Sequence, residues 1–290
     1  MNHAQLRAFH AVASAGGFTR AAEALHVTQP TLSGQVKGLE DGYGVRLFNR
    51  RGRRIEPTEV GHSLLEITRR YFSLEAEVEQ LLAATRGLKR GHLRVGADAP
   101  YHVMPALAAF GAKYPGVRVS LSIGNSAAVL HDLIEHRSDV AVLANVAGDP
   151  RLVAEPLRRD PLVGFVHRAH PWAHRRRVPA AELPRQRLVL REPGSTTRRI
   201  FETAMARAGI ALGEVLEIGS REAVREAVAA GLGVGVVSEA EFRRDGRLRA
   251  FTIEDLCLET VEYVVCLAER QQLRLVKTFL QVVKQTAGNG

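Results

Sequence analysis

The sequence predicts a multidomain protein in which a mainly helical N-terminal part precedes an α/β domain of two subdomains. Three observations predict this architecture. Apolar residues recur at helical spacing through residue 39, and a second helix pattern with few helix breakers runs from about residue 58 to about residue 88. Strand and helix patterns then alternate from residue 91 onward. The 290 residues are enough for roughly two or three domains with buried cores.

The charge balance and the cysteine content narrow the class of protein. The formal net charge of +9 favours a polyanionic partner, above all nucleic acid. Cys257 and Cys266 form no CxxC motif and no Cys/His cluster, so we expect reduced thiols and no metal site. The sequence shows no signal peptide and no apolar stretch near the ~20 residues of a membrane span. We therefore expect a cytoplasmic protein without a membrane partner.

The stretch Phe18 to Leu39 has the pattern of two short helices joined by a tight connection. We expect the first helix over about 19–25, with Thr19 as its cap, and the second from Thr28, with Pro30 in its first turn. The outward face of the second helix offers short hydrogen-bonding groups and one cation: Thr28, Gln29, Thr31, Ser33, Gln35 and Lys37. Such groups suit base edges and phosphates in a major groove, although a solvated helical hairpin would show the same pattern.

The segment that follows predicts a two-stranded wing with a basic tip. Four arginines surround Gly52, namely Arg50, Arg51, Arg53 and Arg54. A solvated turn would have the same composition, but directly after a candidate helix-turn-helix we favour a wing that grips phosphates. Such contacts position a protein on the duplex without reading its sequence.

A long helix is predicted over about 58–88. Its apolar residues recur at spacings of three and four: Leu64, Ile67, Tyr71, Leu74, Val78, Leu81 and then Leu88. A lone helix could pack this stripe on its own domain. Between a DNA-binding head and a separate domain, a dimer seam is the better use. A dimer would place two reading helices on half-sites about one DNA turn, or a multiple of it, apart.

Residues 91–290 predict a largely parallel sheet with right-handed crossovers. We expect the chain to cross between two subdomains near Asp160 and Cys266, with a cleft between them. The expected domains are a DNA-binding domain (1–58), a linker and dimerisation helix (59–90) and a ligand-binding domain (91–290), with subdomain I over about 91–160 and 267–290 and subdomain II over about 161–266.

Four strand-to-helix junctions are candidate ligand sites, because ligands of open α/β sheets bind beyond the C-terminal strand edges. Free N–H groups at helix N-termini bind anions, whereas ordinary N-capping explains each junction taken singly. The candidate residues are Ala99, Pro100, Tyr101, His102, Asn125, Ser126, Ser195, Thr196, Thr197, Arg198, Ser220 and Arg221. Asp98, Glu192 and Glu222 flank these junctions, and one of them facing the cleft would suit a zwitterion.

Motifs for catalysis are absent from the sequence. It contains no GxSxG elbow, no P-loop and no HExxH motif, so we expect neither an enzyme nor a cofactor. The glycines at 231, 233 and 235 fit a strand in a tight contact between subdomains better than a dinucleotide fingerprint. His167, His170 and His174 lie in a segment that we expect to be a solvated loop.

Residues 18–61, FTRAAEALHVTQPTLSGQVKGLEDGYGVRLFNRRGRRIEPTEVG, resemble the LysR-type transcriptional regulators. The resemblance implies a winged helix-turn-helix, a linker helix and an effector domain similar in fold to periplasmic solute-binding proteins. It also implies tetramers that bend promoter DNA, with RNA polymerase as a further partner. The family's DNA contacts would fall on Gln29, Pro30, Thr31, Ser33, Lys37 and Arg50. Gly34 departs from the family, many of whose members carry Arg there.

The effector domain resembles a narrower group, the regulators associated with aminoethylphosphonate catabolism. The segments APYHVMP, IGNSAAVL, LREPGSTTRR and EIGSREAVREAVAAGLGVGVVSEAEF carry this resemblance. We expect a homodimeric or homotetrameric regulator that binds double-stranded promoter DNA and a small anionic or zwitterionic effector. The alternatives are a LysR-type regulator of sulfur, amino-acid or aromatic-acid metabolism, and a solute-binding module without specific DNA binding.

Overall fold

The computed structural model describes residues 1–51, 54–83, 91–146, 148–243 and 245–287, without the side chains of 50–51, 54, 76–77, 79–81, 83 and 287. The chain folds into two compact units, residues 1–85 with 135–137, and residues 86–134 with 138–290. None of the described helices is long and apolar enough to cross a membrane.

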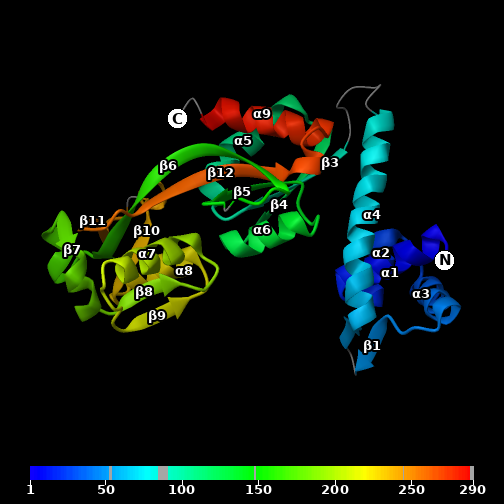
Figure 1. Cartoon of the computed structure of the whole chain (residues 1–290), viewed down its shortest axis with the longest axis horizontal. Helices are drawn as coiled ribbons and strands as arrows, with labels where there is room; N and C mark the ends of the chain where they lie inside the picture. The colour runs from blue at the N-terminus through cyan, green and yellow to red at the C-terminus, as the bar shows by residue number, and fades with distance from the viewer. Residues whose placement is uncertain (52–53, 84–90, 147, 244, 288–290) are drawn as a thin grey trace. The chain divides into compact units, whose positions relative to one another are not determined.

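The first unit contains four helices and a two-stranded wing (Figure 1). Its elements are α1 (His3–Ala15), α2 (Phe18–Leu25), α3 (Gln29–Tyr43), β1 (Phe48–Arg51), β2 (Arg54–Pro57) and α4 (Glu59–Ala83). The prediction that Thr19 caps the first helix of the pair was wrong. Helix α2 begins at Phe18, so Gly17, which has no side chain to cap with, occupies the N-cap position and Thr19 lies inside the first turn.

The core of this unit joins α1, α2 and α3 to the wing and to one face of α4. Phe9, Leu32 and Leu47 are almost fully buried, and Phe9 stacks at 5.4 Å on Phe48. Leu65 is the main apolar contribution of α4 to this core. The core therefore fixes α3 with its opposite face turned away from the unit.

The second unit is an α/β structure built on a ten-stranded sheet. Its strands are β3 (Gly91–Ala97), β4 (Val117–Ile123), β5 (Val140–Ala144), β6 (Leu152–His167), β7 (Arg177–Pro179), β8 (Leu188–Arg191), β9 (Val215–Ile218), β10 (Val234–Ser238), β11 (Leu248–Glu254) and β12 (Glu259–Leu267). Its α-helices are α5 (Pro100–Lys113), α6 (Ser126–Ile134), α7 (Thr196–Arg207), α8 (Arg221–Ala229) and α9 (Arg274–Ala287). Short 3-10 helices are η2 (Pro171–His174), η3 (Ala180–Arg185), η4 (Glu239–Glu241) and η5 (Ala268–Arg270).

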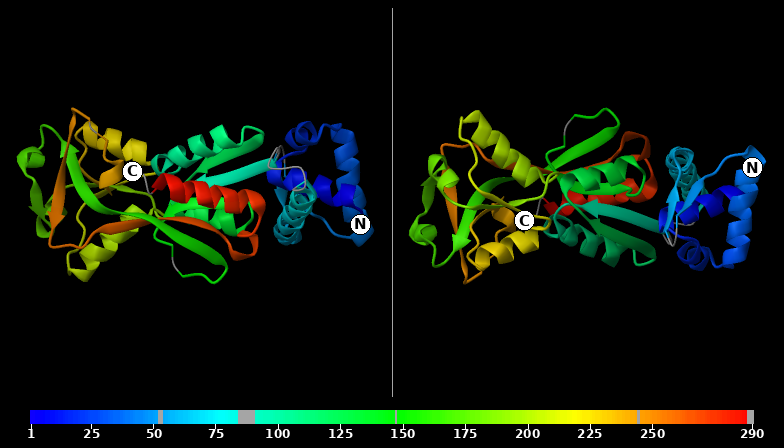
Figure 2. Two further views of the ribbon diagram at one scale, coloured as in Figure 1. Left: turned by 90° about the horizontal axis from the view of Figure 1, so that it is seen from above. Right: turned by 90° about the horizontal axis from the view of Figure 1, so that it is seen from below.

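The strand order is β4-β3-β5-β12-β6-β10-β8-β9, and β11 pairs with β6 and β7. We call the β4-β3-β5 part with α5, α6 and α9 lobe I, and the β10-β8-β9 part with α7, α8, β7 and β11 lobe II. Strands β6 and β12 run side by side between the lobes, as Figure 2 shows from two further sides. Both are antiparallel to their neighbours, whereas β3, β4, β5 and β8, β9, β10 pair in parallel within their lobes.

The sequence pattern identified only the second half of β6, at Leu162–Val166. The first half alternates charged and half-buried residues, so it lacks the continuous apolar run of the second half. At about 3.4 Å per residue, a strand of 16 residues is long enough to serve both lobes. The sheet is therefore mixed, and the expected largely parallel arrangement holds only inside each lobe.

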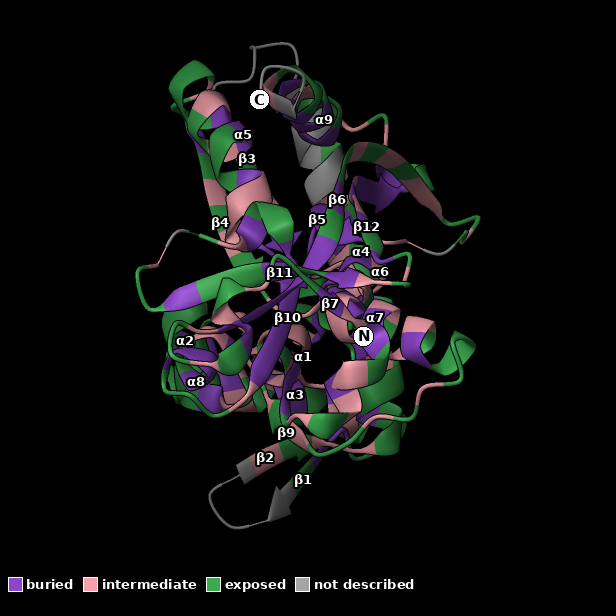
Figure 3. Ribbon diagram, turned by 90° about the vertical axis from the view of Figure 1, so that its left-hand side faces the viewer, coloured by how far each residue is buried: buried purple, intermediate pink, exposed green. Residues whose placement is uncertain are grey.

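Helices cover both faces of each lobe, and the central strands are buried. Every residue of β5 and β10 is buried, and Figure 3 shows the buried residues on these strands. In lobe I, Phe110 of α5 and Phe279 of α9 meet edge to face at 5.4 Å. In lobe II, Phe201 of α7 lies in the core with Trp172 of η2. The expected solvated loop around Trp172 is thus a 3-10 helix whose indole is buried.

The glycine-rich strand packs tightly inside lobe II. An added Cβ at Gly235 would lie 2.4 Å from the Phe165 ring, and one at Gly233 would lie 2.3 Å from the Arg187 carbonyl oxygen. The prediction that these glycines lie in a contact between subdomains was therefore wrong. The groups that approach them, the Phe165 ring and the Arg187 carbonyl oxygen, belong to strands next to β10 or to the chain just before β8.

Candidate DNA-binding surface and effector cleft

Helix α3 presents its first turn outward. Thr28 is its N-cap and accepts a 3.3 Å hydrogen bond from the Thr31 backbone N–H, and Pro30 occupies the first turn. Leu32, Val36 and Leu39 are buried on the inward face. The predicted DNA-contacting residues lie on the opposite side: Thr28, Gln29, Pro30, Thr31 and Lys37 are exposed, and Ser33 is half-buried.

Gly34 lies on the exposed part of the same helix. A Cβ built there would have no heavy atom within 4 Å. Its glycine is therefore not required by packing, and a side chain would fit without displacing any neighbour.

Glu40 joins α3 to the wing, a role that the sequence pattern did not reveal. Its Oε1 accepts hydrogen bonds from the backbone N–H groups of Leu47 (2.8 Å) and Phe48 (3.3 Å). Next to this contact, an added Cβ at Gly61 would lie 2.2 Å from the Leu47 carbonyl oxygen. Only glycine permits α4 to approach the wing so closely.

The basic tip of the wing is described only in part. Strands β1 and β2 pair antiparallel with Arg51 opposite Arg54. Arg53 lies outside the described residues, as do the side chains of Arg50, Arg51 and Arg54. Their contact with phosphates stays a prediction.

The apolar stripe of α4 divides into two parts. Leu64 is half-buried against the core of the first unit. Ile67, Tyr71, Leu74 and Val78 are 62%, 44%, 59% and 55% exposed. The side chain of Leu81 and all of Leu88 lie outside the described residues. Tyr71 lies against the ring of His3 at 6.3 Å, and the other described residues of the stripe leave a largely exposed apolar face on α4.

All four predicted junctions contribute residues to one narrow cleft between lobe I and lobe II. Its residues are Asp98, Asn125, Ser126, Ala144, Arg191, Ser195, Thr196, Thr197, Arg221, Ser238, Glu241, Thr260 and Glu262. Two predicted residues of the last two junctions, Ser220 and Arg198, do not line the cleft. Ser220 caps α8 by accepting a 3.1 Å bond from the Ala223 N–H, and Arg198 pairs with Glu202 and Glu217.

The N-terminus of α7 faces this cleft without a side-chain cap. Ser195 occupies the N-cap position but makes no capping hydrogen bond, and both Ser195 and Thr196 are buried. Thr197 lines the cleft and a neighbouring cavity. An uncapped helix N-terminus presents free N–H groups and the positive end of the helix dipole, which together attract an anion.

The neighbouring cavity has a volume of about 170 Å³. Its lining combines apolar side chains with four arginines, Arg191, Arg221, Arg225 and Arg243. The Arg243 guanidinium lies 4.3 Å from the centre of the Tyr101 ring, and Glu222 lines the same cavity. Sequence reasoning missed Arg191, Arg225 and Arg243, because none of them lies in a hydroxyl-rich junction.

Asn125 connects the two lobes at the edge of the cleft. Its Nδ2 donates a 3.0 Å hydrogen bond to Glu192 Oε1, and its Oδ1 accepts one of 2.9 Å from the Ala128 N–H. Hydrogen bonds from Arg191 and Asn125 lower the pKa of Glu192 to about 2, although burial opposes this shift. Glu192 is therefore ionised and already paired.

Buried charges fill the deep end of the cleft. Asp98 Oδ2 accepts hydrogen bonds from Ser126 Oγ (2.5 Å) and the Ala144 N–H (2.9 Å). Arg221 Nε lies 2.7 Å from Glu241 Oε2, and its Nη1 donates to the Asp98 carbonyl oxygen at 3.0 Å. Burial is the largest cause that raises the pKa of Asp98. Burial and the negative charges of Asp98 and Glu241 raise the pKa of Glu262 to about 9.

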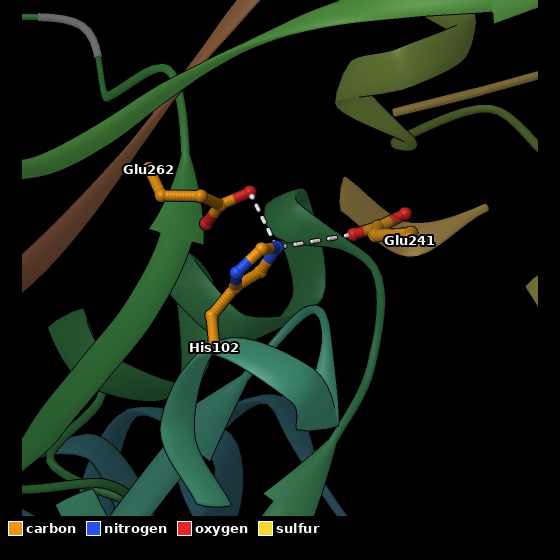
Figure 4. A group of neighbouring side chains, drawn as sticks. All are labelled: His102, Glu241 and Glu262. Atoms are coloured by element: carbon orange, nitrogen blue, oxygen red, sulfur yellow. Dashed lines mark ion pairs between the residues drawn. The ribbon is translucent and has the colours of Figure 1, made fainter. Parts of the chain in front are cut away.

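His102 lies beside these carboxylates, on α5 (Figure 4). Its Nε2 is 3.4 Å from Glu241 Oε1 and 3.7 Å from Glu262 Oε1. The side chains of Glu241 and Glu262 come from η4 and β12, so sequence spacing did not indicate that they meet His102. Of the first junction, Ala99 is fully buried and Tyr101 lines the larger cavity, whereas Pro100 starts α5.

Comparisons with known proteins identify the family of both units. Residues 3–62 match the model of the bacterial regulatory helix-turn-helix protein, lysR family, and residues 86–288 match the LysR substrate binding domain. The chain is 31% identical over 281 residues to the HTH-type transcriptional activator CmpR of Synechocystis sp., covering 95% of this chain and 92% of that protein. It is 32% identical over 291 residues to the RuBisCO operon transcriptional regulator of Acidithiobacillus ferrooxidans, covering 99% and 94%.

Solved structures agree with this assignment. Full-length CbnR complexed with its target DNA superposes with a TM-score of 0.71 at 25% identity, covering 99% of this chain and 100% of that chain. The Synechocystis PCC6803 CcmR regulatory domain in complex with 2-PG gives a TM-score of 0.64 at 28% identity, covering 69% and 99%. The alternative of a solute-binding module without a DNA-binding function is thereby overturned. The chain belongs to the LysR family of DNA-binding transcriptional regulators, which are not enzymes.

Proposed function

We propose that this regulator binds promoter DNA through the exposed first turn of α3 and the wing, and that a small anionic or zwitterionic effector binds between lobe I and lobe II. The uncapped N-terminus of α7, which opens into a cleft lined by residues of both lobes, carries the proposal. Ser195 and Thr197 face Asn125 and Ser126 of the other lobe there. Arginines of the adjoining cavity add positive charge.

The proposed mechanism is linkage between the cleft and DNA. An effector that contacts both lobes favours the lobe arrangement in which those contacts exist together. Since β6 and β12 are the two long strands that run between the lobes, they are the natural place for a change of angle. A change in lobe angle alters how copies of the chain pair, and therefore the spacing and bend imposed on promoter DNA.

The proposed assembly is a dimer through α4, with two dimers forming a tetramer. The exposed residues Ile67, Leu74 and Val78 support this seam, because a soluble helix rarely leaves such a stripe uncovered. Leu74→Glu is expected to yield monomers in light scattering, whereas Arg70→Glu, which also places a glutamate at an exposed position of α4, is expected to leave the assembly intact. Unchanged assembly of Leu74→Glu would remove α4 from the interface.

The regulated pathway is open between two proposals. The effector-domain segments favour aminoethylphosphonate catabolism, whereas the similar proteins include a RuBisCO operon regulator and a regulatory domain bound to 2-PG. The names of these proteins therefore favour carbon fixation. We propose that the effector is either 2-PG or 2-aminoethylphosphonate. Which of the two compounds binds decides between the two proposed pathways.

Isothermal titration calorimetry of the full chain with 2-PG and, separately, 2-aminoethylphosphonate tests the site. We expect one of them to bind, and Thr197→Val to weaken its binding about tenfold or more through loss of a hydrogen bond to a charged group. Thr203→Val, on an exposed face of the same helix, is the matched control. Equal affinities of Thr197→Val and the wild type would move the effector site elsewhere. Failure of both probes would reject both named effectors.

A further inference from the structure

The deep end of the cleft contains donor atoms that the effector proposal does not use. We propose that His102, Glu241 and Glu262 bind a divalent transition-metal cation, and that this metal is a second ligand of the regulator. The three residues offer one imidazole nitrogen and two carboxylate oxygens, and these atoms all lie within 4.8 Å of one another. Figure 4 shows the three side chains directed at a common point.

The distances suit a shared ion better than direct hydrogen bonds. His102 Nε2 lies 3.4 Å from Glu241 Oε1 and 3.7 Å from Glu262 Oε1, beyond the usual range of an N–H···O bond. Zinc binds imidazole nitrogen and carboxylate oxygen at about 2.0–2.2 Å, so two tetrahedral ligands of one ion lie roughly 3.4 Å apart. The site therefore has nearly the spacing that a bound ion requires.

The three side chains are buried, and atoms of two of them lack a hydrogen-bond partner in the described part of the chain. The side chains of His102, Glu241 and Glu262 are only 4%, 2% and 3% exposed. Among the described residues, neither His102 Nε2 nor Glu262 Oε2 has a hydrogen-bond partner. Most buried polar atoms in folded proteins have a partner, so an imidazole nitrogen aimed at two carboxylates without one indicates a missing ligand.

The charged groups around the three residues bear on the sign of the ligand. Arg221 Nε lies 2.7 Å from the other Glu241 oxygen, Oε2, which leaves Oε1 on the side of His102. Asp98 adds negative charge nearby, so a cation is favoured over an anion.

The pairing of β12 with β6 is irregular next to Glu262. The register between β12 and β6 shifts between Glu262 and Tyr263. Such bulges often redirect a side chain next to a functional site.

The mixed nitrogen and oxygen donors suit Zn²⁺, Mn²⁺, Fe²⁺, Co²⁺ or Ni²⁺ better than Ca²⁺ or Mg²⁺.

The three ligands come from different parts of the second unit. His102 lies on α5 of lobe I, Glu241 on η4 beside lobe II, and Glu262 on β12 between them. A metal held by all three would tie the lobes together in the arrangement of this structure. Metal binding would then change the affinity for the organic effector and, by reciprocity, the effector would change the affinity for metal.

The test uses the purified full-length protein after treatment with a chelator. Zn²⁺ and Co²⁺ are titrated in competition with a chromophoric chelator, and the Co²⁺ absorption spectrum reports the geometry of the site. We expect one ion per chain, an increase of the melting temperature, and a loss of affinity of ~10–100-fold or more in both His102→Gln and Glu262→Gln. His131→Gln, which changes an exposed histidine of α6, should bind as the wild type does.

Equal affinities of His102→Gln, Glu262→Gln and the wild type would overturn the proposal, as would the absence of stoichiometric binding by the wild type. Circular dichroism checks that both variants are folded. If either is not, X-ray absorption of the Co²⁺-loaded wild type decides, because one imidazole among oxygen ligands is expected and a shell of oxygens alone would reject the site. Thr197→Val should retain full metal affinity, which distinguishes this site from the proposed effector site.

Discussion

The exposed turn of α3 and the cleft between the lobes place their functional residues in opposite ways. On α3, the residues proposed to read DNA come from one stretch, 28–37, and point away from a core that is already satisfied. In the cleft, the residues come from distant segments and are buried against each other, as when Arg221 reaches the Asp98 carbonyl across 123 positions. The difference teaches that α3 can change its chemistry without changing its fold, whereas each cleft residue affects stability and binding together.

The largest expected effect tests whether the core of the first unit, rather than the exposed turn of α3, stabilises the helix-turn-helix and the wing. Gly61→Ala would place a Cβ against the Leu47 carbonyl oxygen, which already accepts a 2.9 Å bond from the Thr58 N–H and so cannot move freely. We expect the first unit to lose ~1–3 kcal/mol or more of stability. Hydrogen exchange of the α4 amides measures this. Gly42→Ala, in open space on α3, is the control, and equal protection in both variants would contradict the close contact.

Gln29→Ala separates base reading from fold. Because Gln29 is exposed and outside the core, we expect a loss of ~1–3 kcal/mol on the selected operator, little loss on random DNA and an unchanged melting temperature. Lys37→Ala should lower the affinity for the operator and for random DNA equally. It should also reduce the salt dependence of that affinity, as loss of a phosphate contact does. Fluorescence anisotropy at several salt concentrations compares them. An equal loss on both DNAs for Gln29→Ala would remove this residue from base reading.

The cleft should show a pH dependence that α3 lacks. The folded protein raises the pKa of Glu262 from 4.5 to about 9, so the folded state retains a proton that the unfolded chain releases. In the metal-free protein, this group therefore favours folding below pH 4.5, and its contribution falls as the pH rises from about 4.5 to about 9.

Glu262→Gln is expected to keep the neutral form and to raise the melting temperature at alkaline pH by on the order of 2–4 °C. Scanning calorimetry of the chelator-treated proteins between about pH 6 and about pH 9 measures the difference in melting temperature between the variant and the wild type. Parallel pH profiles of the variant and the wild type would show that Glu262 is ionised in the folded protein.

The smallest expected effect is a gain in the stability of α3 at its exposed residue Gly34. Gly34→Ala should stabilise α3 by ~1 kcal/mol, because glycine is a poor helix former and the new methyl group meets nothing. Gly34→Arg should also raise the affinity for all DNA by adding a phosphate contact, whereas Gly42→Arg adds the same charge near the other end of the helix. Equal gains in affinity from both arginine variants would indicate general attraction rather than a contact at position 34.

The sequence by itself determined the helix-turn-helix, because each of its elements depends on residues that are close together in the chain. Helical spacing, the Thr28 cap and the buried positions Leu32, Val36 and Leu39 all report on one element and its neighbours in the chain. Most strands and helices of the second unit were predictable for the same reason, but β7, β11 and the first half of β6 were not predicted. A periodic pattern records which face of an element is buried.

Only the tertiary structure decided which residues meet in the cleft. Arg198 was a predicted effector-binding residue yet pairs with Glu202 and Glu217, whereas Arg243 and Glu241 line the cavity and were not predicted to do so. The strand order brings η4 and β12 beside α5, and no pattern within one segment contains that order. Because buried charges obtain their partners across the sheet, the chemistry of the cleft depends on the whole fold.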